Sequence, residues 1–400
     1  MEKKRVLIVN KFYYPRGGDC IVAMNLERLL KEHGHDVAVF AMDYPENVDS
    51  GWNKYYASQV EFEGSWCNKI RAAKRLMGWG DIKLAFNKIL NDFKPDIVHL
   101  HNIHSYLSPV LAKLAKHRGC RVVWTLHDFK LVCPSYSCLL NGKPCEKCIG
   151  HSKMHVLKTH CMKDSFAAST MAYIETRKWN RYVLESYTDA FVCPSQFMES
   201  KMRKDGFDSE KLHVVCNHID PVKLELFNSM NNTREDYYAY VGRLSTEKGI
   251  ETLLNVASKL PYPLKIAGDG PLSQRLKDQY AYNKNILFLG RQNAQQVATL
   301  LSKARFSIMP SECYDNNPLG VIESLCAGTP VVGARIGGIT ELLDDENGIT
   351  FTSGNKEELE KTIDKAYSIF WDFNTIRERA IQRFSPKKHL DKILSIYDSL

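Results

Sequence analysis

Two cations and a glycine in the second half of the chain have the types and spacing of an anion-binding site. Gly242 and Arg243 follow the apolar run at residues 237–241, and Lys248 lies five positions after Arg243. Glycine allows close approach of a backbone, Arg can bind two oxygens in a fork, and Lys supplies a point charge at a predicted helix start. The set favours a bound diphosphate. A structural salt bridge is the alternative interpretation.

Two carboxylates flank a second predicted helix start. Asp315 precedes the segment at residues 316–319, and Glu323 lies eight positions after Asp315. Backbone amides at a helix start bind anions. This spacing therefore predicts an anion at the helix start, with both carboxylates on one side of the site. Gly268 and Gly270 form another junction between a strand and a helix.

The first half carries a weaker set of the same kind. Gly17 and Gly18 lie between a predicted strand and a predicted helix, where they either approach a ligand or serve packing alone. His127 ends a predicted strand, where it either contacts a ligand or is a buried structural histidine. His99 and His101 share one face of a strand and are interpreted as lining a cleft, not as metal ligands.

These residues are positioned by a regular alternation of short apolar runs and helical patterns. Near-continuous apolar runs are typical of strands buried on both faces of a parallel sheet. The alternation predicts an α/β fold with two Rossmann-like doubly wound domains facing across a cleft, where the carboxyl ends of the strands meet. The predicted strands are residues 6–10, 37–41, 96–101, 121–126, 190–194, 212–216, 237–242, 264–268, 286–290, 306–310, 330–334 and 348–351. The predicted helices lie near residues 20–33, 82–92, 107–118 and 165–187.

The alternation of apolar runs and helical patterns is interrupted once, by a polar stretch that contains Pro221. This interruption predicts an interdomain linker. The first domain is expected at residues 1–218, the linker at 219–236 and the second domain at 237–384. A C-terminal helix at residues 385–400 is expected to pack back on the first domain.

In this order, the motifs resemble those of the family 4 glycosyltransferases, which are retaining nucleotide-sugar enzymes of the two-domain GT-B architecture. The resemblance spans most of the chain. Its elements are Gly17-Gly18, His127-Asp128, Gly242-Arg243, Glu247-Lys248-Gly249, Gly268-Asp269-Gly270-Pro271, the pair Asp315 and Glu323, and the segment from Ala327 to Val332.

The resemblance implies a role for each matching position. Arg243 and Lys248 would hold the donor diphosphate and stabilise the departing nucleotide, and Asp315 and His127 would contact the donor sugar. Glu323 would accept hydrogen bonds from the ribose. The other implied donor-binding residues are Gly17, Gly18, Gly242, Gly270, Arg291, Asn316, Asn317, Pro318 and Leu319. No catalytic metal or other cofactor is implied.

The implied function is a retaining hexosyltransferase that moves a sugar from a nucleoside diphosphate donor to a glycan or lipid-linked acceptor in the biosynthesis of cell-surface polysaccharide (lipopolysaccharide or capsule). Asp315 departs from the Glu that the family usually has at this position, and Asn217-His218 departs from the family's frequent Asn-Gly. A nucleotide-sugar epimerase of the same fold and a catalytically weakened sugar-nucleotide binding or scaffold protein remain alternatives.

A cysteine-rich insert follows His127 at about residues 133–161. Cys145 and Cys148 have the spacing of a zinc-binding thiolate pair, which Cys133 and Cys161 would complete as a structural site. Cys138 or a histidine are alternative ligands. Reduced cysteines that pack as small apolar groups, or that form disulfides only in air, are the other interpretation.

Charge and hydropathy narrow the expected partners. Residues 1–218 carry 32 Lys and Arg against 23 Asp and Glu, whereas residues 219–400 carry 22 against 23. Residues 66–90 interleave cations with apolar side chains, which fits either an anionic membrane surface or two helices with an apolar face toward the core. No nucleic-acid motif accompanies the charge. With no signal peptide or membrane span, we expect a cytoplasmic protein with peripheral contact at the inner face of the membrane.

Overall fold

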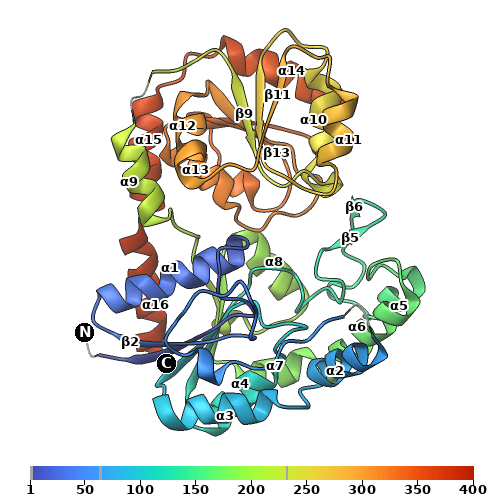
Figure 1. Ribbon diagram of the computed structural model, residues 1–400, viewed down its shortest axis with the longest axis vertical. Coiled ribbons are helices and arrows are strands. Elements are labelled where there is room, and N and C mark those ends of the chain that lie inside the picture. The colour runs from blue at the N-terminus through green and yellow to red at the C-terminus, as the bar shows by residue number, and fades with distance from the viewer. Residues whose placement is uncertain (1–2, 63–64, 231–232) are drawn as a thin grey trace. The chain divides into compact units, whose positions relative to one another are not determined.

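The computed structural model describes residues 3–62, 65–230 and 233–400. Residues 1–2 of the predicted first domain and residues 231–232 of the predicted linker lie outside these ranges. The chain divides into two compact units, each built around its own sheet (Figure 1). Unit 1 comprises Met1–Cys138, Cys145–Val215 and Leu390–Leu400, and unit 2 comprises Leu139–Pro144 and Cys216–His389.

The sheet of unit 1 is parallel throughout, with the strand order β2-β1-β3-β4-β7-β8. The order reverses between β1 and β3, and in doubly wound sheets ligands bind outside such a switch point. The strands are β1 (Arg5–Val9), β2 (Asp36–Phe40), β3 (Ile97–Leu100), β4 (Arg121–Thr125), β7 (Ala190–Cys193) and β8 (Leu212–Val214).

Helices cover this sheet because alternate strand residues point to opposite faces and both faces are apolar. Val6 and Ile8 of β1 pack in one core with Leu26 of α1 and with Ile393 and Leu394 of α16. The helices are α1 (Gly18–Glu32), α2 (Trp66–Leu76), α3 (Ile82–Phe93), α4 (Val110–His117), α5 (His155–Thr159), α6 (Phe166–Lys178), α7 (Arg181–Tyr187), α8 (Gln196–Lys204) and α16 (Pro386–Ser399).

The single helix predicted at residues 165–187 is wrong, because the chain forms two helices there. Helix α6 ends at Lys178, and the side chain of Asn180 caps α7 by accepting a hydrogen bond from the Val183 amide. Asn is a favoured N-cap residue, so the break has a local cause.

The sheet of unit 2 is also parallel and has the order β11-β10-β9-β12-β13-β14, with its switch point between β9 and β12. Together the two sheets confirm the predicted pair of Rossmann-like doubly wound domains, and each predicted strand is present. The strands are β9 (Tyr238–Val241), β10 (Leu264–Ala267), β11 (Ile286–Gly290), β12 (Phe306–Met309), β13 (Val331–Ala334) and β14 (Gly348–Phe351).

Both faces of this second sheet are packed as well. Tyr238 and Tyr240 of β9 share a core with helices α10 and α14, whereas the intervening Ala239 packs with Leu300 of α12 (Figure 1). The helices are α9 (Pro221–Ser229), α10 (Ile250–Ala257), α11 (Ser273–Gln279), α12 (Ala294–Lys303), α13 (Leu319–Cys326), α14 (Lys356–Ser368) and α15 (Phe373–Arg383). Short 3-10 turns include η3 (Thr246–Lys248) and η4 (Ile339–Glu341).

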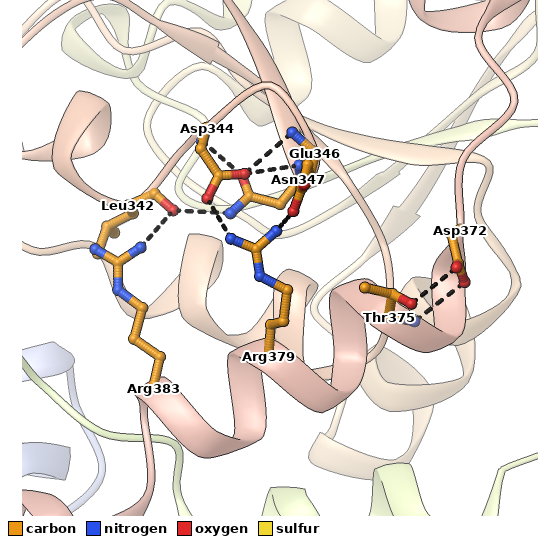
Figure 2. Close-up of polar contacts among 8 residues, drawn as sticks. All are labelled: Leu342, Asp344, Glu346, Asn347, Asp372, Thr375, Arg379 and Arg383. Carbon is orange, nitrogen blue, oxygen red and sulfur yellow. Dashed lines mark hydrogen bonds and ion pairs between the residues drawn. The ribbon is translucent and has the colours of Figure 1, made fainter.

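Helix α15 holds the loop between η4 and β14, as Figure 2 shows. The Arg379 guanidinium pairs with Asp344 at 3.2 Å and also with Glu346. Asp372 caps the helix by accepting a hydrogen bond from the Thr375 amide at 3.1 Å. The two ion pairs of Arg379 tie the helix to the loop that leads into β14.

The segment expected as a linker contains a regular helix. Asp220 caps α9 by accepting from the Val222 amide, Pro221 occupies its first turn, and Phe227 is buried against residues of α12 and α13. Pro is well tolerated in the first helical turn because its missing N–H would be unpaired there in any case. Residues 219–229 are therefore an integral part of unit 2.

Candidate active site

Two of the charged residues predicted from the second half, Lys248 and Asp315, lie at the switch point of unit 2. The loop after β9 carries Lys248, and the loop after β12 carries Asp315. Because β9 and β12 are neighbours in the sheet, these two loops emerge side by side. The Glu312 amide donates to the Glu247 carbonyl at 2.9 Å, so the two loop backbones are in direct contact.

Gly249 is required for this close approach. It has φ of +68°, and a Cβ at this position would lie 1.8 Å from the Pro310 carbonyl oxygen. No side chain fits there without moving one of the two loops. Gly249 therefore fixes the distance between the segments that carry Lys248 and Asp315.

Lys248 and Asp315 form an ion pair with Nζ 2.5 Å from Oδ1. Burial disfavours the charge of Lys248, but the acidic groups around it, the Asp315 carboxylate foremost, together raise the pKa of the lysine above its usual value. The second carboxylate oxygen of Asp315 accepts a hydrogen bond from the Ser311 hydroxyl. A partly buried ammonium and a carboxylate are thus held together at the sheet edge.

The backbone of Asp315 is held as firmly as its side chain. Its carbonyl accepts a hydrogen bond from the Gly338 amide at 2.7 Å. Gly337, with φ of +60°, leaves no room for a Cβ, which would lie 2.4 Å from the same carbonyl oxygen. The turn before η4 therefore positions this carboxylate.

Glu323 lies on α13 and is 8% exposed. Its Oε1 pairs with Lys223 Nζ of α9 at 2.6 Å. The sequence predicted the carboxylate but not its cation, because Lys223 falls in the segment interpreted as a linker.

Asn317 joins the loop before α13 to the first residues of unit 2. Its Oδ1 accepts from the Asn217 amide at 3.0 Å, and its carbonyl accepts from Asn217 Nδ2 at 2.9 Å. Its own Nδ2 is buried and has no hydrogen-bond partner within the described residues. Asn317 thus presents an unused donor just before α13, which begins at Leu319 after the N-cap Pro318.

The remaining predicted residues of unit 2 are more dispersed. Arg243 is exposed in the loop after β9, and its guanidinium forms no ion pair with any residue in the described ranges. Gly270 lies in the turn after β10, where its amide donates to Ser273 Oγ at 2.7 Å. Arg291 follows the edge strand β11, two strands or roughly 10 Å from β9.

The residues predicted in unit 1 lie around its own switch point. Helix α1 begins at Gly18, with Gly17 as its N-cap. Next to them, Asp19 pairs with Lys11 at 3.6 Å and accepts from Asn102 Nδ2 at 3.0 Å. Burial opposes the charge of Asp19, but Lys11 and His127 lower the pKa of this carboxyl below its usual value.

His127 is part of a column of imidazoles. Its Nε2 lies 2.9 Å from His101 Nδ1, and the His101 ring stacks on that of His99 with centroids 4.6 Å apart. Burial lowers the pKa of His127 below its usual value and lowers that of His99 to about 3, so His99 is neutral at pH 7. His99 bonds Thr125 and Tyr397 and is fully buried, so its interpretation as cleft lining is wrong.

The sequence reasoning missed Lys11, Asn102 and Ser311. Lys11 and Ser311 each lie two residues beyond the end of a buried strand, β1 and β12, and Asn102 lies two residues beyond β3. These strands flank the two switch points. Their positions just after strand ends are a signal that the sequence contains. Recognising it requires knowing which strands are neighbours in the sheet.

The cysteine-rich insert is anchored by ion pairs. Glu146 bonds Lys201 at 2.5 Å and Lys204 at 2.8 Å, both on α8, and Lys153 pairs with Asp205 at 2.5 Å. These contacts tie the insert to α8 and to the residue that follows it.

The predicted zinc ligands of the insert are Cys133, Cys145, Cys148 and Cys161. A hydrogen bond from the Cys138 thiol lowers the pKa of Cys133 to about 6, and Ser135 Oγ lies 3.2 Å from its sulfur. Within residues 3–62, 65–230 and 233–400, no three His, Cys, Asp or Glu side chains are placed to hold a metal ion. The four thiols do not form a ligand set as they stand, and zinc binding stays a prediction.

The fold is that of solved glycosyltransferases. The lipopolysaccharide outer core galactosyltransferase WaaB in its apo form matches with a TM-score of 0.68 at 15% identity, over 99% of both chains. Alr3699/HepE of Anabaena, solved with UDP and glucose, matches with a TM-score of 0.64 at 16% identity, over 99% of this chain and 100% of that one. The fold is therefore the two-domain GT-B architecture.

The family follows from the sequence comparisons. Residues 16–223 match Glycosyltransferase Family 4, and residues 223–383 match the family described as Glycosyl transferases group 1. The chain belongs to Glycosyltransferase Family 4, which confirms the resemblance stated from its motifs.

Two relatives come from bacterial surface-polysaccharide systems. An uncharacterized 42.6 kDa protein in the cps region of Klebsiella pneumoniae is 26% identical over 84% of this chain and 87% of that protein. The O-antigen biosynthesis glycosyltransferase WbnH of Escherichia coli is 29% identical over 70% of this chain and 72% of that protein.

Proposed function

We propose that this glycosyltransferase transfers a hexose from a nucleoside diphosphate donor to a glycan or lipid-linked acceptor of a cell-surface polysaccharide, with retention at the anomeric carbon. The observation that carries the proposal is the Lys248–Asp315 pair at the switch point of unit 2. The unused Asn317 donor before α13 adds a second group that suits a phosphate. The UDP complexes of the structurally similar HepE support a nucleotide-sugar donor.

In the proposed reaction, the bond between C1 and the phosphate oxygen breaks, and the electron pair leaves with the nucleoside diphosphate. An acceptor hydroxyl forms the new bond to C1 from the same face, and its proton passes to the departing phosphate oxygen. Lys248 and Arg243 stabilise the charge that develops on the leaving group, which is electrostatic catalysis. Asp315 orients Lys248 and contacts the donor sugar, and Glu323 accepts from the ribose.

Donor binding is tested by thermal unfolding with UDP-glucose, UDP-galactose, GDP-mannose and ADP-glucose. A ligand that binds only the folded protein raises the midpoint, so at least one of these donors is expected to raise it. Failure of every donor to do so would contradict the proposed class of substrate.

Transfer is tested with the donor that binds and a polyprenyl-linked glycan. We expect nucleoside diphosphate release together with a mass increase of one sugar on the glycan. Anomeric coupling in the first product, measured by NMR, reports retention. Free nucleotide without any added sugar would instead favour the epimerase alternative, and donor binding without transfer, restored by Asp315→Glu, would favour the weakened binding protein.

A further inference from the structure

The water-facing side of α2 in unit 1 carries apolar residues where polar ones are usual. Trp66 is 80% exposed and Ile70 is 53% exposed, one turn apart, while Ala72 and Leu76 on the opposite side are buried. Surface helices normally turn polar residues to water. Packing against the core therefore does not account for the apolar content of this helix.

Exposed cations surround these apolar residues. Lys69, Arg71 and Lys74 occupy the same exposed arc of α2, and Lys69 Nζ lies 5.7 Å from the centre of the Trp66 ring. The single acid of residues 66–90, Asp81, is neutralised by Arg75 at 2.7 Å. The arc is positive as well as apolar.

The same composition continues onto the start of α3 and onto α6. Trp79 and Leu84 are exposed, and Lys178 of α6 lies 5.0 Å from the centre of the Trp79 ring. Trp179 Nε1 donates to the Leu76 carbonyl at 2.9 Å, so the ends of α2 and α6 are in contact.

Helix α6 then adds its own exposed stripe. Phe166, Ile174 and Arg177 are exposed on it, whereas its acid Glu175 is buried and paired with Lys130 at 2.8 Å. We call the exposed residues Trp66, Lys69, Ile70, Arg71, Lys74, Trp79, Lys83, Leu84, Phe166, Ile174 and Arg177 the basic aromatic face.

We infer that the basic aromatic face docks unit 1 on a bilayer containing anionic lipid. Aromatic side chains with neighbouring cations suit the headgroup layer, where the ring meets acyl chains and the cation meets phosphate. A second copy of the chain is the poorer occupant, because a symmetric dimer would press two positive faces together. No helix in the described ranges is long and apolar enough to cross a bilayer, so the contact is peripheral.

The experiment is cosedimentation of the full chain with phosphatidylcholine vesicles, with and without phosphatidylglycerol, in the absence of nucleotide sugar. We expect binding only to the phosphatidylglycerol vesicles and its loss at high salt. Lys69→Ala/Arg71→Ala/Lys74→Ala should weaken binding by roughly 100-fold, and Trp66→Ala/Ile70→Ala by about tenfold or more.

Matched controls lie in unit 2. Lys259→Ala/Lys277→Ala/Lys284→Ala removes three exposed lysines, and Tyr282→Ala/Phe370→Ala removes two fully exposed aromatic rings. Both controls should bind as the parent does, and all variants should keep its thermal midpoint. Equal binding by face and control variants would overturn the inference, as would a dimer that Trp66→Ala/Ile70→Ala dissociates. Donor-induced thermal shifts are independent of vesicles, so failure here leaves the sugar-transfer proposal standing.

Discussion

Lys248 Nζ and Asp315 Oδ1 are 2.5 Å apart although 67 positions separate the two residues in the chain. Each lies in the loop after one of the two strands that flank the switch point of unit 2. The shorter side chain at position 315, Asp where the family usually has Glu, still reaches the lysine. A diphosphate that binds as proposed therefore has to compete with this carboxylate for the ammonium group.

Removing the ammonium group tests its proposed role in catalysis. Lys248→Ala is expected to lower kcat by about 100-fold or more, because an oriented charge at the leaving group is lost. The measurement is initial rate of nucleoside diphosphate release. Lys259→Ala, which removes an exposed lysine of the same unit, should leave kcat unchanged. Near-normal turnover in Lys248→Ala would contradict the assignment.

Removing the partner carboxylate tests the same pair from the other side. In Asp315→Asn, burial acts on Lys248 without the opposing carboxylate, so the pKa of the lysine should fall. Donor affinity should then decline at a lower pH than in the parent when pH is raised. If donor affinity declined at the same pH in both proteins, Asp315 would not control the charge of Lys248.

Gly249 and Gly290 provide a matched pair for testing the close approach of the two loops. Their φ values are +68° and +69°, but only Gly249 has a backbone atom where a Cβ would lie. Gly290→Ala should cost about 1–2 kcal/mol of unfolding free energy from its backbone conformation alone. Gly249→Ala should cost more and should also lower kcat, because the loops must separate. If urea unfolding showed equal losses of unfolding free energy in Gly249→Ala and Gly290→Ala, this account would be contradicted.

The buried column of histidines predicts that the folded protein loses stability in acid. The unfolded-state pKa of His99 is about 6.5, and burial lowers the folded-state pKa to about 3. Between these values the unfolded chain binds a proton that the native protein excludes, so stability is complete above pH 6.5 and falls as the pH drops. His99 alone should cost about 2 kcal/mol between pH 7 and pH 5.

His99→Gln removes this titration. The variant should be less stable than the parent at pH 7 but should lose less stability on acidification, as measured by urea unfolding at both pH values. His151→Gln, at an exposed position, should show the parent's pH dependence. An unchanged dependence in His99→Gln would place the acid sensitivity in other groups.

Zinc in the insert is a separate prediction. Protein purified without chelators is expected to contain one zinc per chain by elemental analysis, and Cys145→Ser/Cys148→Ser should abolish it. Cys67→Ser, at an exposed cysteine outside the insert, should retain it. Folded, active protein without metal would show that the ion pairs of Glu146 and Lys153 suffice to hold the insert.

The strands and the helices α1, α3, α4 and α16 could be predicted because local patterns specify them, whereas the pairings within the site depend on strand order. Gly242, Lys248 and Asp315 were found from the glycine and charge patterns at strand ends, but the Lys248–Asp315 contact requires β9 and β12 to be neighbours. Lys223 was missed because α9 has too short an apolar pattern. Asp220 and Pro221 were its only start signals.

The sequence interpretation of residues 66–90 left open whether the apolar side chains face water or the core. Ile82, Phe86 and Ile89 pack into the core as one of the two interpretations expected, while Ile70 and Leu84 do not. The contribution of α6 to that face was also unpredicted, since only its contact with α2 brings the two helices together.

Helix α16 has a consequence for how the protein is made. Ile393, Leu394 and Tyr397 complete the core that Val6 and Ile8 begin, yet the whole of residues 216–389 lies between these segments in the chain. The ribosome must therefore synthesise unit 2 before α16 can pack against β1 and complete the core of unit 1. Until then the first half of the nascent chain has an apolar surface that α16 does not yet cover.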